Sequence, residues 1–191
     1  MHRRHVVLGG LGFFFFREVH AQGVSRVRGA ALINGQPATP GMALRAGDTV
    51  VTGPGSDIVF VAGRDAMLVR QSSNLALAED GFRLVTGAVL GVFAPRRRKN
   101  LHTVTATIGI RGTAVYVEAE RARTYVCTCY GETVLEPADD PKARERVRPA
   151  QRHGEPRFIA PSGAPRMVAP APMRNHTEAE IELLESLRNR G

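Results

Sequence analysis

Turn residues recur so often between residues 23 and 137 that they limit each uninterrupted segment to the length of a short strand. They follow one another roughly every eight to twelve residues, an interval typical of all-β domains. Between them, residues 58–61 (IVFV) are continuously apolar, which predicts a strand buried on both faces. No window keeps a helical period of 3.6 residues. The pattern predicts an all-β fold, a compact β-sandwich or jelly-roll-like domain of short strands. The clearest turn signals are Asn34-Gly35, Gly47-Asp48, Gly53-Pro54, Gly63-Arg64 and Asp80-Gly81.

Further glycines interrupt the β-patterned runs in the second half of this region. Gly87 separates two apolar runs, and Gly131 predicts a bulge or turn. Gly109 and Gly112 are expected at backbone angles closed to larger residues.

The first 21 residues have the organisation of a secretory signal. Arg3 and Arg4 provide a positive start, and residues 6–16 form an apolar run of eleven residues. Such a run covers about 16 Å as a helix, roughly half of the hydrocarbon core, so it does not predict a membrane span. We expect cleavage after Ala21 and a periplasmic product that does not span the membrane. The adjacent arginines leave both the general secretory and the twin-arginine route open.

The net charge of +8 is high enough to attract nucleic acid or an anionic membrane surface. Export makes nucleic acid an improbable partner, and the sequence contains no nucleic-acid-binding motif. We therefore expect no nucleic-acid partner.

The composition changes after residue 136. Eight of the twelve prolines fall between Pro137 and Pro172, among charged residues and alanines. Residues 138–175 are predicted to form a Pro-rich linker or tail, extended or loosely docked, with Phe158 and Ile159 as an anchor. Residues 176–191 predict a short amphipathic helix, because Thr177 and Glu180 form a capping box before an apolar stripe.

Cys127 and Cys129, the only cysteines, lie two residues apart on a predicted strand, so their side chains share one face. Their Cα atoms would be roughly 6.5–7 Å apart, at the limit for a disulfide. Three alternatives remain open: buried inert thiols, a strained disulfide favoured by an oxidising compartment, or a soft transition-metal site. His153 and His176 are the candidates to complete a Cys2His2 set, although a single residue between the cysteines is uncommon in zinc sites.

No catalytic constellation is present. The sequence lacks a G-x-S-x-G elbow, an H-E-x-x-H motif, a phosphate-binding loop and a paired acid with a suitable base. We expect the protein not to be an enzyme. We also expect it to need no cofactor, unless the cysteines hold a soft transition metal.

Several motifs follow one another in the order of a known family. Gly41, Leu44, Gly47-Asp48, Val50 and Thr52 match the pattern G-x-x-L-x-x-G-D-x-V-x-T, and residues 56–61, 84–89, 103–107 and Arg111-Gly112-Thr113 continue the series. Together they make residues 22–137 resemble a FecR-like domain. The resemblance implies an all-β periplasmic domain without catalytic residues that binds a protein partner or relays a signal. It also implies that the motif residues are structural, namely Gly47, Asp48, Thr52, Arg111, Gly112 and Thr113.

The sequence differs from the transmembrane regulators of that family. We expect no cytoplasmic anti-sigma region before the domain, because residues 1–21 are predicted to be a secretory signal, and no spanning helix is predicted. We expect a freestanding exported FecR-like module that binds an envelope protein as a scaffold or signalling component. The alternative is a metal- or redox-active periplasmic protein that uses Cys127 and Cys129 with the tail histidines.

Overall fold

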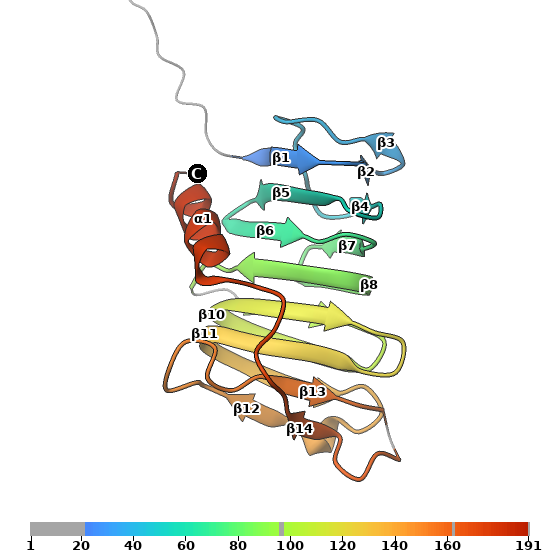
Figure 1. Cartoon of the computed structure of the whole chain (residues 1–191), viewed down its shortest axis with the longest axis vertical. Coiled ribbons are helices and arrows are strands. Elements are labelled where there is room, and N and C mark those ends of the chain that lie inside the picture. The colour runs from blue at the N-terminus through green and yellow to red at the C-terminus, as the bar shows by residue number, and fades with distance from the viewer. Residues whose placement is uncertain (1–21, 96–97, 162, 191) are drawn as a thin grey trace, which may run out of the picture.

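The computed structural model describes residues 22–95, 98–161 and 163–190, so the signal sequence predicted for residues 1–21 lies outside it. The described residues are mostly β, as predicted, and Figure 1 shows the strands stacked along the longest axis. One 3-10 helix, η1 (Pro141–Ala143), and one α-helix, α1 (Glu178–Asn189), accompany them. The strands are β1 (Gly23–Arg28), β2 (Ala31–Ile33), β3 (Gln36–Pro37), β4 (Thr49–Thr52), β5 (Asp57–Ala62), β6 (Asp65–Val69), β7 (Asn74–Ala78), β8 (Gly81–Val92), β9 (Arg98–His102), β10 (Ala106–Ala119), β11 (Thr124–Pro137), β12 (Glu145–Val147), β13 (Arg157–Ile159) and β14 (Val168–Pro170).

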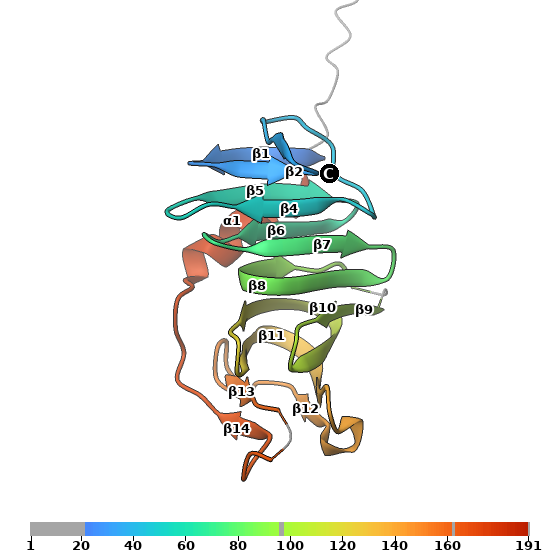
Figure 2. The same cartoon turned by 90° about the vertical axis from the view of Figure 1, so that its right-hand side faces the viewer.

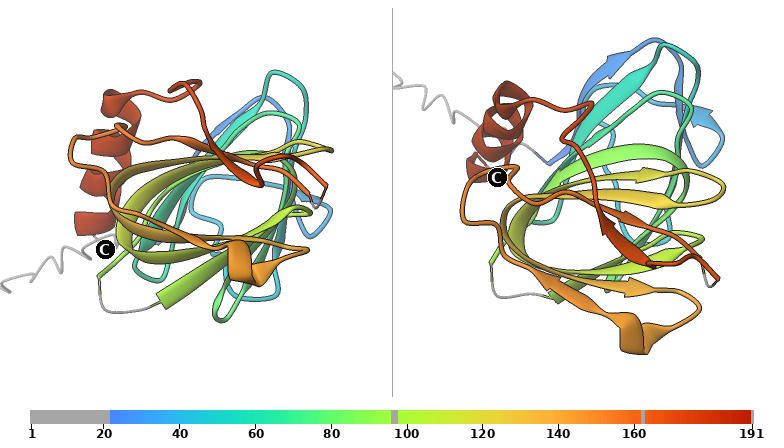
Figure 3. Two further views of the ribbon diagram at one scale, coloured as in Figure 1. Left: turned by 90° about the horizontal axis from the view of Figure 1, so that it is seen from below. Right: turned by 60° about the horizontal axis from the view of Figure 1, so that its bottom comes forward.

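The strands form two layers that belong to one continuous sheet. The helix-side layer contains β1, β5, β6, β13, β14 and one half each of β8, β10 and β11. The far layer contains β2, β3, β4, β7, β9, β12 and the other halves of the same three long strands. The pairs are antiparallel except for β8 with β9. Figure 2 shows the far layer, and the left panel of Figure 3 shows the two layers from below.

Glycines mark the points at which the three long strands cross from one layer to the other. Gly87 in β8, Gly112 in β10 and Gly131 in β11 all have positive φ, between +57° and +87°. β8 pairs with β7 up to Thr86 and with β6 from Val89. Gly87 therefore bends one strand and does not separate two. The expectation for Gly109 was wrong, because its φ is not positive and a Cβ there would meet nothing closer than 3.6 Å.

The apolar core has two parts, one between the layers and one beneath α1. Ile58 and Phe60 of β5 point into the first, and Val59 and Val61 point into the second. All four are at most 1% exposed, which confirms the prediction of a strand buried on both faces.

The Pro-rich segment is better ordered than its composition predicts. β12 pairs with the far-layer half of β11, β13 pairs with the helix-side half, and β14 adds to β13. The prediction from composition considers only the apolar surface that the segment can bury by itself. The edge of β11 lies outside the segment and provides hydrogen-bond partners for its backbone. This pairing with β11 orders the segment.

The predicted C-terminal helix is present. Thr177 is the N-cap, and its capping box with Glu180 is complete. The apolar stripe, Ile181, Leu184 and Leu187, is buried against the helix-side layer. No helix in the described part of the chain is long and apolar enough to cross a membrane.

Candidate metal centre

Both cysteines lie on the helix-side half of β11 and face α1's side of the layer, as the alternation of strand side chains predicts. Each is 0% exposed, and neither sulfur is bonded to the other. Thr128, between them, points to the opposite face and meets the Thr133 hydroxyl at 2.6 Å. β11 therefore presents two free thiols, side by side, on the face that α1 and the tail cover.

Two segments of the tail bring histidines over the cysteines. His153 lies in the loop between β12 and β13 at a φ of +60°, and its backbone N–H donates to the carbonyl of Cys129 at 3.1 Å. His176 precedes the N-cap of α1, is 4% exposed, and stacks on the ring of Tyr116 with centroids 4.5 Å apart. The structure thus brings together all four residues that the sequence offered as metal ligands.

Three of the distances between the four ligand atoms are close to the edges of a tetrahedral coordination sphere. The Cys127 Sγ, the Cys129 Sγ, a nitrogen of His153 and a nitrogen of His176 all lie within 4.8 Å of one another. The two nitrogens, Nδ1 of His153 and Nε2 of His176, are 3.0 Å apart. The sulfur–nitrogen distances are 3.7 Å for Cys127 to His153 and 3.4 Å for Cys129 to His176. Bonds of about 2.3 Å to sulfur and 2.0–2.1 Å to nitrogen give tetrahedral edges of about 3.3 Å between nitrogens and 3.6 Å between nitrogen and sulfur.

The outer nitrogen of each histidine has an acceptor for its proton. His176 Nδ1 lies 2.7 Å from the carbonyl oxygen of Arg174, and His153 Nε2 lies 3.1 Å from a carboxylate oxygen of Glu178. A carbonyl or carboxylate in this position fixes the tautomer of a metal-binding histidine. With protons on the outer nitrogens, the inner nitrogens, His153 Nδ1 and His176 Nε2, can each offer a lone pair to an ion. Their separation of 3.0 Å also fits a hydrogen bond between the two rings when one inner nitrogen carries a proton.

The charge distribution of the cluster favours a cation. The hydrogen bond from the Cys129 thiol, aided by the His176 and His153 imidazoles, lowers the pKa of Cys127 to about 5 from 9.0. The same hydrogen bond, together with burial and the neighbouring thiolate, raises the pKa of Cys129. Metals bind the thiolate form of cysteine, so Cys127 is prepared for ligation at neutral pH.

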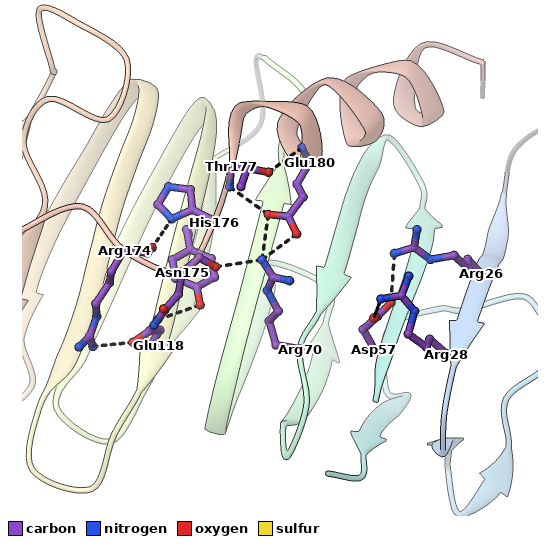
Figure 4. A network of polar contacts seen from close by, with 11 residues as sticks. Arg26, Arg28, Asp57, Arg70, Glu118, Arg174, Asn175, His176, Thr177 and Glu180 are labelled. Atoms are coloured by element: carbon purple, nitrogen blue, oxygen red, sulfur yellow. Dashed lines mark hydrogen bonds and ion pairs between the residues drawn. The ribbon is translucent and has the colours of Figure 1, made fainter. Parts of the chain in front are cut away.

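A polar network holds the strap that carries His176, which we define as residues 171–177 (Figure 4). Arg174 pairs with Glu118 and Glu120 of the layer below, and its guanidinium lies 4.6 Å from the centre of the Tyr125 ring. Arg70 donates to the carbonyl of Asn175 at 2.9 Å and pairs with Glu180 at 2.8 Å. The strap is therefore fixed on both sides of His176.

The motif residues of the family resemblance are not among the four ligands, and they make structural contacts. Asp48 accepts hydrogen bonds from the Asn34 side chain at 2.7 Å and from the Arg45 backbone at 2.8 Å. Gly47, beside it, has a φ of +94°. The Thr52 hydroxyl accepts from the Ser73 backbone at 3.0 Å.

The Arg111-Gly112-Thr113 corner is the bend of β10. The Thr113 hydroxyl donates to the carbonyl of Tyr130 across the bend, and Thr113 is fully buried. Arg111 is exposed and lines a polar groove of about 380 Å³ in the far layer.

Sequence reasoning missed the residues that support the histidines. An acid in the first turn, such as Glu178, suits the helix dipole in any helix, so its sequence position alone does not indicate a partner for an imidazole. Tyr116 lies within a β-patterned run, and nothing in that pattern marks it as the stacking partner of His176. The carbonyl of Arg174 leaves no signal in the sequence.

Comparisons with known proteins identify the fold only. No family model matches the chain, and no curated protein matches it. Among solved structures, two crystal structures from Parabacteroides distasonis, at 1.65 and 2.50 Å resolution, show a protein described as a candidate anti-sigma factor. They superpose with TM-scores of 0.53 and 0.52 at 11% identity, over 70% of this chain. The chain spans 62% of the length of those proteins. The likeness is consistent at the level of fold with FecR-like sensor domains.

Proposed function

We propose that this protein is a metal-binding regulatory module with a FecR-like fold, in which Cys127, Cys129, His153 and His176 hold one divalent ion. The observation that carries the proposal is the convergence of these four ligand atoms within 4.8 Å from three separate parts of the chain. The module works by binding an envelope protein in the exported compartment and performs no catalysis. Its fold is similar to that of a candidate anti-sigma factor, and this likeness suggests that the protein signals through a protein partner.

Zinc is the ion that suits this set of ligands. A set of two sulfurs and two nitrogens favours zinc among the common divalent metals. Two thiolates, two neutral imidazoles and one divalent ion sum to zero charge. Zero net charge matters because both sulfurs are completely buried, and burying an uncompensated charge is costly.

Burial also argues against the redox alternative. Thiol–disulfide exchange requires an incoming thiolate to reach a sulfur. Both sulfurs are 0% exposed and lie beneath the tail. The geometry therefore supports ligation over exchange.

The first prediction concerns metal content. The full chain, purified from its native export route, is expected to contain about one zinc per protein by elemental mass spectrometry, because four ligands make one site. Cys127→Ser and His176→Gln are each expected to reduce the zinc content by at least about tenfold, since three ligands bind far less tightly. His102→Gln, a histidine in the far layer, is the matched control and should retain the zinc. Full zinc content in Cys127→Ser and His176→Gln would contradict the site.

The second prediction concerns export. If residues 1–21 are a secretory signal, the mature protein begins at Gln22 and occurs in the periplasmic fraction. Amino-terminal sequencing of the protein from fractionated cells checks both statements. A cytoplasmic product that still carries residues 1–21 would overturn the proposed location.

A further inference from the structure

His176 joins the metal centre to the C-terminal helix. It lies one residue before Thr177, the N-cap of α1, so a bond at its Nε2 fixes the start of the helix. Glu178, in the first turn of α1, also accepts the outer proton of His153 at 3.1 Å. Both histidines therefore connect the ion to the same end of α1, one through the chain and one through a carboxylate.

The helix depends on such attachments to stay in place. α1 has twelve residues, and a helix of that length is marginal in water without tertiary contacts. It buries only three side chains fully, Ile181, Leu184 and Leu187. The remaining attachments include partly exposed ion pairs and hydrogen bonds, such as Arg70 with Glu180, and solvent weakens pairs of that kind.

The surface under α1 is strongly apolar. Val59 and Val61 of β5, Leu68 of β6 and Leu90 of β8 are each at most 2% exposed, and all belong to the cluster that the helix covers. Contiguous apolar patches of this kind are rarely left open on a soluble domain. Displacement of α1 would therefore change the surface that the module presents to its surroundings.

We infer that occupancy of the metal centre determines whether α1 stays on the helix-side layer, so that the ion acts as a latch on the C-terminal segment. This inference rests on the proposed metal site and adds its regulation. With the ion bound, the four ligands hold His153 and His176 to β11, and α1 covers the apolar face. Without the ion, the bonds that hold His153 and His176 to β11 are lost, the strap opens locally, and the apolar face is uncovered.

Hydrogen exchange of the full chain tests the latch directly. At a free zinc concentration of about 100 times the dissociation constant, an opening that breaks the site is suppressed about 100-fold. Amides of α1 are therefore expected to exchange about 100-fold faster in the zinc-stripped protein than in the zinc-loaded protein. Amides of β7, in the far layer, report global unfolding and separate it from local opening. A hydrophobic dye such as ANS should bind to the stripped protein and be released when zinc is restored.

Two variants sharpen the test. His176→Gln in the presence of zinc is expected to exchange like the stripped wild type, and His102→Gln like the loaded wild type. If His176→Gln does not fold, the comparison of stripped with loaded wild type remains decisive. One bound zinc with unchanged exchange in α1 would overturn the latch and leave the metal site intact. Absence of zinc binding would overturn both.

Discussion

Removal of the metal from the loaded protein is expected to lower its melting temperature by about 8–16 °C. A ligand present at 1,000 times its dissociation constant stabilises the folded state by about 4 kcal/mol. In a chain of this size, each kcal/mol corresponds to about 2–4 °C. The measurement is a thermal scan of the loaded protein, the chelator-treated protein and the chelator-treated protein after zinc is returned.

The ion also joins parts of the chain that are far apart in sequence. His153 lies 26 residues after Cys127, and His176 lies 47 residues after Cys129. A cross-link over such distances restricts the unfolded chain as a disulfide does. His102→Gln should respond to the chelator as the wild type does, whereas Cys127→Ser should not respond. An unchanged melting temperature in the chelator-treated wild type would contradict a bound structural ion.

Gly87→Ala is expected to lower the free energy of unfolding by about 4 kcal/mol. Gly87 bends β8 from one layer to the other at a φ of +87°, where a side chain strains the backbone. A Cβ there would lie 2.5 Å from the Cα of Ser73, and overpacking adds about 1–3 kcal/mol to the strain. A shift of Ser73 would also break its hydrogen bond from the Ala88 backbone, at 2.9 Å. Urea denaturation measures the loss.

Gly47→Ala is the matched control for this variant. Gly47 also has positive φ, +94°, but a Cβ there would meet nothing within 4 Å. Only the backbone strain remains, so the expected loss is about 1–2 kcal/mol. Equal losses in the two variants would show that the close approach of β8 to Ser73 does not exist in solution.

The sequence predicted local structure well because each local feature has a local cause. Asn34 and Gly35 both have positive φ in the β2–β3 hairpin, and Thr177 with Glu180 begins α1. The bends of the long strands were not predictable in the same way. A glycine that ends a strand and a glycine that bends a strand have similar neighbours in sequence. The pairing of Gly87 with Ala119 across the sheet shows that Gly87 bends its strand.

The candidate site was predictable in its residues but not in its assembly. The shared face of Cys127 and Cys129 follows from the two-residue period of a strand. The positions of His153 and His176 depend on the edge of β11 and on contacts such as Arg174 with Glu118, between residues far apart in the chain. The composition of the Pro-rich tail contains no information about those contacts, so the positions of the two histidines could not be predicted from it.

X-ray absorption of the zinc-loaded protein tests the central claim most directly, because it reports the elements bound to the ion and their distances. We predict about two sulfur neighbours near 2.3 Å and about two nitrogen neighbours near 2.0–2.1 Å. A coordination shell of only oxygen and nitrogen, without sulfur, would place the ion elsewhere and contradict the proposed site.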